Sequence, residues 1–132
     1  MKKIVIIDYN IGNLQSVQAA FLRLGQETVI SRGLEEIRKA DALILPGVGA
    51  FPTAMNNLKN FILFELIKER AAAGIPILGI CLGMQVLFEK GYEIEERQGL
   101  GLLKGEVIPI KTNEKIPHMG WNQLKLAKTS PT

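Results

Sequence analysis

Cys81 is the residue whose type and setting point most directly to covalent chemistry. It is the only cysteine, and it stands in GICLGMQ, residues 79–85, between an apolar run and an amphipathic run. Glycines two residues before and after a nucleophile are typical of a strained strand-to-helix turn, because side chains there would collide with neighbouring backbone. Such a turn exposes the sulfur, and the N-terminus of the following helix favours thiolate over thiol. The alternative is an inert core cysteine, the commoner role of a lone cysteine in an apolar segment.

A thiolate that attacks a carbonyl needs backbone N–H donors for the oxyanion that forms. The N–H of Leu82, directly after the cysteine, is expected to be free for this purpose. The glycine-rich bend PGVG, residues 46–49, offers further donors, although an ordinary Pro-Gly turn is the commoner explanation of such a stretch. Gln85 follows Cys81 by four residues, so both side chains would share one helix face. A solvated glutamine is the simpler explanation for that position.

Alternating apolar and amphipathic runs predict the elements that position these residues. Strands are expected over residues 3–7, 27–30, 42–45 and 75–80, with 3–7 and 42–45 buried. Helices are expected over 13–24, 34–39 and 82–89, and one or two helices over 53–59 and 61–73. Asn13 is expected to cap the first helix, and residues 46–52 to form a loop. Later in the chain, short antiparallel strands are expected over 105–110 and 121–126.

This alternation predicts an α/β fold, a doubly wound and mostly parallel sheet. Ligands of such folds bind at the carboxyl ends of the strands, near the point where the strand order reverses. Three stretches are expected at such ends: residues 8–13, residues 46–51 and Cys81. The sequence therefore predicts one site where these three stretches meet.

The composition is that of a globular protein of one domain. The 132 residues are 47% hydrophobic and 22% charged, with a net charge of +3. No basic stripe or aromatic platform indicates nucleic-acid binding, and no apolar run approaches the ~20 residues that span a bilayer. One cysteine excludes an internal disulfide and, with one histidine, disfavours a zinc site. We expect a cytoplasmic protein that needs no metal or other cofactor.

GICLGMQ, preceded by ILPGVGAF at residues 44–51, closely resembles the class I (triad type) glutamine amidotransferases. In that family the cysteine attacks the side-chain amide of glutamine, a γ-glutamyl thioester forms, ammonia leaves, and water releases glutamate. The resemblance implies that Cys81 is the nucleophile of a flavodoxin-like amidotransferase fold. It places the oxyanion and the glutamine substrate on Gly47, Val48, Gly49, Leu82 and Gln85.

Two further stretches, DYNIGNLQSV at residues 8–17 and PHMGWN at residues 117–122, look like the amidotransferase subunits that serve imidazole glycerol phosphate synthase in histidine biosynthesis. Subunits of that kind pass ammonia to a separate (β/α)₈-barrel cyclase subunit. The resemblance therefore implies a heterodimer with that barrel. The implied interface residues are Gly12, Asn13, His118, Met119, Gly120, Trp121 and Asn122. From the residues alone, Trp121 is as easily explained as a core side chain.

Cysteine amidases also need a histidine base and an acid that orients it. The family carries both in a downstream H-x-E motif, which does not occur here, and the single histidine, His118, belongs to the PHMGWN match. We therefore expect residues 1–132 to be the N-terminal part of one amidotransferase domain, with its C-terminal strands incomplete. Such a chain should lack glutaminase turnover by itself and should self-associate through uncovered sheet edges.

Three other functions stay open on the sequence. A flavodoxin-like binding module without catalysis would have an unreactive thiol. A protein of the intracellular-protease and glyoxalase-like superfamily would place a carboxylate, such as that of Asp8, against the cysteine. Another triad amidotransferase, serving nucleotide or tryptophan synthesis, fits the cysteine motif but not DYNIGN and PHMGWN.

Overall fold

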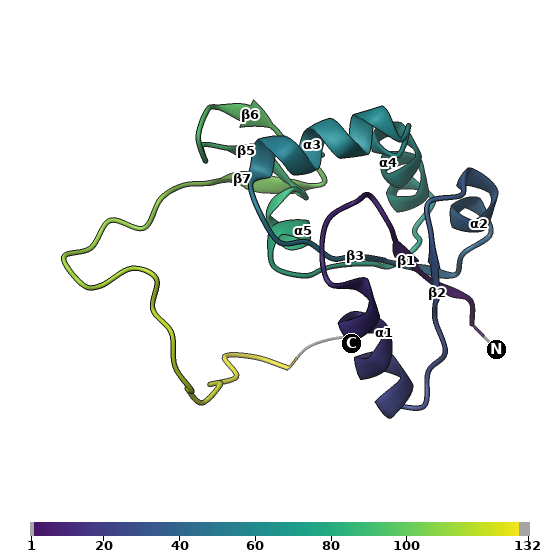
Figure 1. The fold of residues 1–132 in the computed structure, drawn as a ribbon, viewed down its shortest axis with the longest axis horizontal. Coiled ribbons are helices and arrows are strands. Elements are labelled where there is room, and N and C mark those ends of the chain that lie inside the picture. Colours follow the sequence, from purple (N-terminus) through teal and green to yellow (C-terminus); the bar gives the residue numbers. More distant parts are fainter. Residues whose placement is uncertain (1, 130–132) are drawn as a thin grey trace.

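A four-stranded parallel sheet forms the centre of the structure, a computed structural model that describes residues 2–129. Its strands run in the order β2-β1-β3-β4, and β1 pairs with both β2 and β3 (Figure 1). The direction of winding therefore reverses between β1 and β3, which makes that place the topological switch point. The expected doubly wound, mostly parallel α/β fold is confirmed.

Strands and helices alternate through most of the described chain. The elements around the main sheet are β1 (Ile4–Ile7), α1 (Leu14–Arg23), β2 (Val29–Ser31), α2 (Leu34–Arg38), β3 (Ala42–Leu45), α3 (Phe51–Asn60), α4 (Phe64–Ala72), β4 (Ile77–Gly79) and α5 (Leu82–Gln85). The side chain of Asn13 accepts a hydrogen bond of 3.4 Å from the N–H of Ser16, so the expected N-cap of α1 is confirmed.

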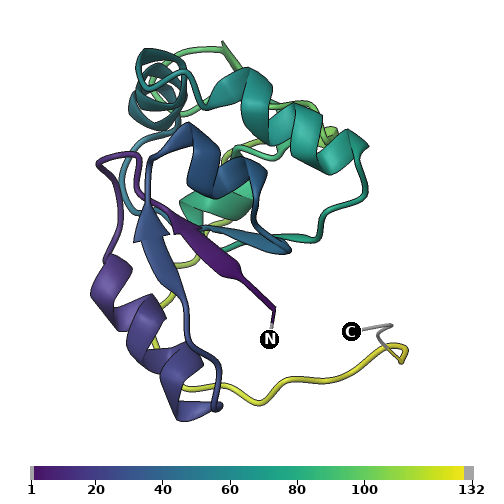
Figure 2. The same ribbon diagram turned by 90° about the vertical axis from the view of Figure 1, so that its right-hand side faces the viewer.

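The two faces of the main sheet are covered unequally. Helices α2, α3 and α4 lie on one side of the sheet, and α1 lies on the other (Figures 1 and 2). The core between the sheet and α2–α4 includes Val5, Ile7, Ile37, Leu43, Leu45, Phe51, Met55, Leu58 and Ile67. By contrast, α1 buries none of its residues, and Leu78 of β4 is 51% exposed. The chemistry-bearing loops are therefore supported from the α2–α4 side.

A second, smaller sheet follows, and it corrects one predicted helix. Its strands are β5 (Phe88–Gly91), β6 (Arg97–Gln98) and β7 (Leu103–Val107); β5 pairs antiparallel with β6 and parallel with β7. The prediction of a helix over 82–89 is wrong in its second half, because α5 ends at Gln85 and Phe88 pairs with Leu103. A partner strand that lies further along the chain outweighs local helical spacing here.

The predicted loop over 46–52 is slightly too long, because α3 already begins at Phe51. Pro52 lies in the first turn of α3, where a missing N–H costs little since that group has no partner within the helix. The N–H of Phe51 donates to the carboxylate of Glu93 at 3.3 Å. The segment between β5 and β6 thereby holds the helix start that follows the bend.

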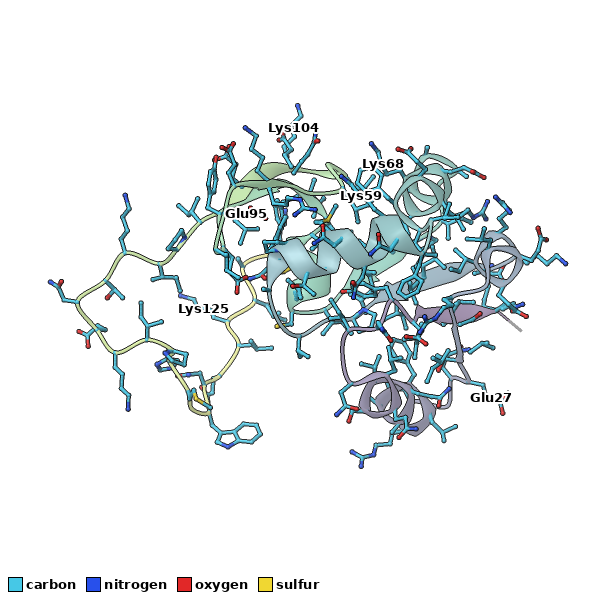
Figure 3. The ribbon with its side chains drawn as sticks, turned by 45° about the horizontal axis from the view of Figure 1, so that its top comes forward. Glu27, Lys59, Lys68, Glu95, Lys104 and Lys125 are labelled. Carbon is cyan, nitrogen blue, oxygen red and sulfur yellow. The ribbon has the colours of Figure 1, made fainter. Side chains whose placement is uncertain are left out.

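Residues 108–129, called the arm below, extend away from the packed body (Figure 1). Every residue of the arm is exposed, and Figure 3 shows Lys125 on it, apart from the helices. The strand predicted over 105–110 is confirmed only at 105–107, since β7 (Leu103–Val107) ends there, and its expected antiparallel pairing is wrong because it pairs parallel with β5. The strand predicted over 121–126 is wrong, since these residues lie in no strand. A strand is not stable without a neighbour, and within the described residues 121–126 have none.

Two kinds of feature are missing among residues 2–129. No helix there is long and apolar enough to cross a lipid bilayer. No group of three or more histidine, cysteine, aspartate or glutamate side chains there is arranged to hold a metal ion.

Candidate active site

Cys81 sits on the turn between β4 and α5, as expected for a nucleophile elbow. Its backbone has φ 55° and ψ −118°, and its side chain is exposed. A non-glycine residue at such a positive φ is strained, and it persists only where the surrounding packing imposes it. The alternative of an inert core cysteine does not fit, because the residue is not buried.

Two glycines make this turn possible. A Cβ added to Gly83 would overlap the carbonyl oxygen of Leu45, at the end of β3. A Cβ added to Gly79 would come within 2.6 Å of the Cα of Met84 and 2.8 Å of the Leu87 side chain. The spatial reason expected for the G-x-C-x-G spacing is therefore confirmed.

The three predicted stretches meet at one edge of the sheet. The N–H of Ile80 donates to Leu45 O at 3.0 Å, which ties the residue before the cysteine to the end of β3. Gly12, at φ +105°, lies so close to the bend that an added Cβ would be 3.3 Å from Gly47 N. Residues 8–13, the 46–49 bend and Cys81 thus form one cluster at the switch point.

The N–H of Leu82 is engaged, not free as the sequence suggested. It donates to the carbonyl oxygen of Gly47 with an N···O distance of 3.3 Å. An oxyanion can use this donor only after the Gly47 carbonyl has turned away. Helix α5 also has only four residues, so its dipole at Cys81 is weaker than that of the eight-residue helix expected.

The other residues expected to hold the substrate differ in their exposure. Gly47 is buried, whereas Val48 is 61% exposed and Gly49 adopts φ +112° on the surface. Gln85 is half-buried, and its N–H donates to the carbonyl of Cys81 at 3.1 Å, one helical turn away. The bend and Gln85 therefore flank the cysteine from two elements.

Tyr9 belongs to this cluster, and sequence reasoning missed it. The side chain is fully buried, and its hydroxyl donates a hydrogen bond to the carbonyl oxygen of Pro46. Burial raises the pKa of Tyr9 well above its ordinary value, and the nearby Cys81 raises it further. The signal was period-two alternation, since Val5, Ile7 and Tyr9 are all buried in the same core.

Among residues 2–129, no side chain, basic or acidic, hydrogen-bonds to the thiol of Cys81. The one histidine, His118, lies on the arm, where its Nε2 is 3.0 Å from the side-chain nitrogen of Asn122. Asp8 pairs with Arg32 at 3.0 Å and accepts the N–H of Asn10 at 3.2 Å. Asp8, the carboxylate named for the glyoxalase-like alternative, is therefore committed to other partners.

The residues implied at a partner interface fall into two groups that the structure does not bring together. Gly12 and Asn13 lie beside the bend at the site. Residues 118–122 lie on the arm, where Met119 is 85% exposed and Trp121 is 103% exposed. The core position considered for Trp121 is therefore wrong.

A hollow of about 510 Å³ lies away from this cluster, between α1 and the β1–β2 side of the sheet. Its lining includes Gln18, Leu22 and Val29, and none of the predicted site residues. It marks the thinly covered face of the sheet and has no part in the geometry at Cys81.

Sequence similarity decides the family. Residues 5–130 match the family described as "Glutamine amidotransferase class-I". This chain belongs to that family. As a member, it is 95% identical over 132 residues to the "Imidazole glycerol phosphate synthase subunit HisH" of Lactococcus lactis subsp. lactis (strain IL1403), a match that covers 100% of this chain and 65% of that protein.

More distant relatives of this amidotransferase chain carry the same name. The subunits from Sulfurimonas denitrificans and Aquifex aeolicus are each 52% identical, over 126 and 127 residues. These matches cover 92% and 96% of this chain and 61% of each relative. The chain thus spans 61% to 65% of the length of the three relatives.

A solved structure supports the same family. The protein described as "Crystal structure of glutamine amidotransferase" superposes with a TM-score of 0.67 at 26% sequence identity. The match covers 79% of this chain and 55% of that protein. The main sheet with the cysteine turn is therefore an amidotransferase fold.

Proposed function

We propose that this chain supplies the nucleophile and part of the glutamine site of an imidazole glycerol phosphate synthase amidotransferase, with residues 1–132 in one domain. The observation that carries the proposal is the exposed Cys81, held at φ 55° in a glycine-bracketed turn against Gly47. The 95% identity to a HisH subunit supports the choice of that enzyme among the triad amidotransferases.

The reaction begins at the sulfur of Cys81. The thiolate attacks the carbonyl carbon of the glutamine side chain, and the carbonyl oxygen becomes an oxyanion. The C–N bond then breaks, ammonia leaves with an added proton, and a γ-glutamyl thioester remains. Water hydrolyses the thioester to glutamate and restores the thiol. In this scheme Gln85 holds the substrate. The N–H groups of Gly47, Val48, Gly49 and Leu82 stabilise the oxyanion, the last of them once the Gly47 carbonyl has turned away.

The 132-residue chain by itself should show no glutaminase turnover. Both proton transfers in the reaction need a base beside the sulfur, and no described side chain hydrogen-bonds to it. Release of ammonia from glutamine by the purified chain, lost in Cys81→Ala, would overturn this expectation.

The partner in this proposal is a (β/α)₈-barrel cyclase subunit that receives the ammonia. Gly12 and Asn13 lie at the edge of the sheet where Cys81 opens, which suits an exit toward a partner. On the arm, Trp121 and Met119 are exposed, and large side chains of this kind are favoured at the centres of interfaces.

Covalent labelling tests the glutamine site. The purified chain is treated with a glutamine-mimicking diazo-ketone, and the adduct is located by peptide mass mapping. We expect one adduct, on Cys81, whose formation is slowed by L-glutamine. A reagent one carbon shorter, with the reach of asparagine, is the matched control and should label slowly. Labelling that glutamine fails to slow would sink the proposal.

Sedimentation with the barrel cyclase subunit tests the interface. We expect Trp121→Ala to weaken binding about tenfold, because a buried tryptophan is a typical binding hot spot. Ile110→Ala is the control, since Ile110 lies on the same arm and is 75% exposed. Equal effects of the two substitutions would remove Trp121 from the interface.

A further inference from the structure

Tyr9 is fixed at two points beneath the bend that meets Cys81. Its side chain is fully buried, and its hydroxyl donates to the carbonyl oxygen of Pro46. Its own backbone carbonyl accepts a hydrogen bond of 3.0 Å from the side-chain amide of Asn57, on α3. A buried phenol is costly unless its hydroxyl has a partner, and here that partner is the backbone of the bend.

The hydrogen bond from Tyr9 fixes the orientation of a whole peptide unit in the bend. Because a peptide unit is planar, holding the carbonyl of Pro46 also fixes the direction of the Gly47 N–H. The next peptide unit carries the Gly47 carbonyl, which accepts the N–H of Leu82. The peptide unit after Gly47 can therefore turn while Tyr9 keeps the Pro46–Gly47 peptide unit in place.

Gly47 lies in close contact with the hydroxyl of Tyr9. A Cβ added to Gly47 would lie 2.5 Å from the hydroxyl oxygen of Tyr9 and 3.0 Å from the N of Gly83. Only glycine leaves room for the hydroxyl and for the turn after Cys81 at the same time. The phenol, the bend and the cysteine turn are thus one packed unit.

We propose that Tyr9 is a positioning residue for the glutamine reaction: its hydroxyl holds the Pro46–Gly47 peptide so that the bend presents its N–H groups to the carbonyl bound at Cys81. This inference rests on the proposed function. Tyr9 acts through the backbone and not on the sulfur, so it should affect reactions of a bound carbonyl and leave the intrinsic reactivity of the thiol unchanged.

The first test is independent of catalysis and uses hydrogen exchange of single amides, read by NMR, in the full chain and in Tyr9→Phe. Without the hydroxyl the bend should loosen, and the Leu82 amide should exchange about tenfold faster. The amides of Ile6 and Leu43, in the centre of the sheet, are the internal reference and should keep their rates. Tyr92→Phe is the matched control, since it removes the hydroxyl of the other tyrosine, which directly follows β5.

The second test compares two reagents on Cys81. The glutamine-mimicking diazo-ketone carries a carbonyl that must meet the bend, whereas iodoacetamide reports on the thiol alone. In Tyr9→Phe we expect the maximal labelling rate by the diazo-ketone to fall about tenfold, with an unchanged half-saturating concentration. The iodoacetamide rate should stay within about twofold, a split that general destabilisation would not produce.

The outcomes separate this inference from the proposed function. Failure of the diazo-ketone to label the unaltered chain contradicts the proposed function, and the Leu82 exchange rate then decides alone whether Tyr9 holds the bend. An unchanged Leu82 exchange rate in Tyr9→Phe overturns the inference, and so does an unchanged ratio of the two labelling rates. If Tyr9→Phe does not fold, Gly47→Ala replaces it, since the new methyl group displaces the Tyr9 hydroxyl. Gly47→Ala should also speed Leu82 exchange and slow the diazo-ketone relative to iodoacetamide. If neither rate changes in Gly47→Ala, the inference is overturned.

Discussion

The turn around Cys81 and the arm carry the two motifs that point to the family, and they are built in opposite ways. At the turn, glycines at 79 and 83 bring backbone against backbone. The residues on either side of the cysteine are hydrogen-bonded, Ile80 to the end of β3 and Leu82 to Gly47 of the bend. On the arm, a Cβ added to Gly120 would meet nothing within 4 Å, and Trp121 is 103% exposed.

Packing within the chain explains the residue types of one motif and not those of the other. At the turn, packing within the chain determines which residue types fit, so the described residues alone are enough to hold its geometry. The residues of the arm have no such packing partner among residues 2–129, so packing within that part of the chain does not account for their side-chain types. We therefore expect the same kind of substitution to destabilise the turn strongly and the arm hardly at all.

Substitution of a glycine by alanine should show the largest contrast. In Gly83→Ala the new methyl group would overlap the carbonyl of Leu45, and we expect the free energy of unfolding to fall by about 4 kcal/mol. Gly120→Ala, on the arm, should change it by less than about 0.5 kcal/mol. Urea denaturation of both variants measures this, and a similar loss in the two would erase the distinction between the regions.

Removal of a large aromatic side chain should give the next largest contrast. Phe51 is 1% exposed beside the bend, and Phe51→Ala should cost about 3 kcal/mol through lost contacts and a cavity. Trp121→Ala should leave thermal and urea unfolding unchanged, although tryptophan is the larger residue. A destabilised Trp121→Ala chain would show that the arm packs against the body in solution.

The dependence of stability on pH sharpens the role of Tyr9 at the turn. Its raised pKa means that the folded chain keeps the phenolic proton above about pH 10, where the unfolded chain loses it. The stability that Tyr9 contributes is complete below that pH and falls as pH rises, by at most about 1.4 kcal/mol per pH unit. Urea unfolding from about pH 8 to about pH 11 should show this fall.

Two phenylalanine variants test how much of the alkaline loss of stability comes from Tyr9. Tyr9→Phe should remove most of the alkaline loss of stability, because it removes the buried phenol whose pKa is raised most; the pKa of Tyr92 is also raised, by partial desolvation and by Glu106, and leaves a smaller loss. Tyr92→Phe should keep most of it. If Tyr9→Phe loses stability as steeply as the unaltered chain, the phenol is not the group responsible.

The strain at Cys81 should give the smallest measurable effect. At φ 55° glycine pays no steric penalty, whereas alanine does, so Cys81→Gly should be more stable than Cys81→Ala by about 1 kcal/mol. The comparison uses two inactive variants and is therefore free of any effect on chemistry. Alanine as the more stable variant would mean that the turn is relaxed in solution.

The sequence predicted the site best where local rules apply. Apolar runs located the strands of the main sheet, and the glycine spacing located the turn at Cys81, because both follow from the backbone itself. The second half of the helix over 82–89 was wrong because Phe88 pairs with Leu103, a contact that local spacing does not encode. The strand over 121–126 was wrong for the complementary reason, since apolar residues there have no neighbouring strand.

Two details of the site depended on distances that no pattern reveals. The N–H of Leu82 was expected to be free, but the Gly47 carbonyl, from a stretch more than thirty residues earlier, accepts its hydrogen bond. Tyr9 was missed because it falls in the stretch 8–13, which was expected only to lie at the end of a strand. The structure places its side chain in the core, with its hydroxyl hydrogen-bonded to the backbone of the bend.

One measurement tests most directly whether Cys81 lies in a glutamine site: the rate at which iodoacetamide alkylates it in the presence of different amino acids. We expect L-glutamine to slow the alkylation in a saturable way, and L-asparagine, which is one methylene shorter, to leave it unchanged. An alkylation rate that is the same with and without glutamine, or that both amides slow equally, would contradict a site built for glutamine around this cysteine.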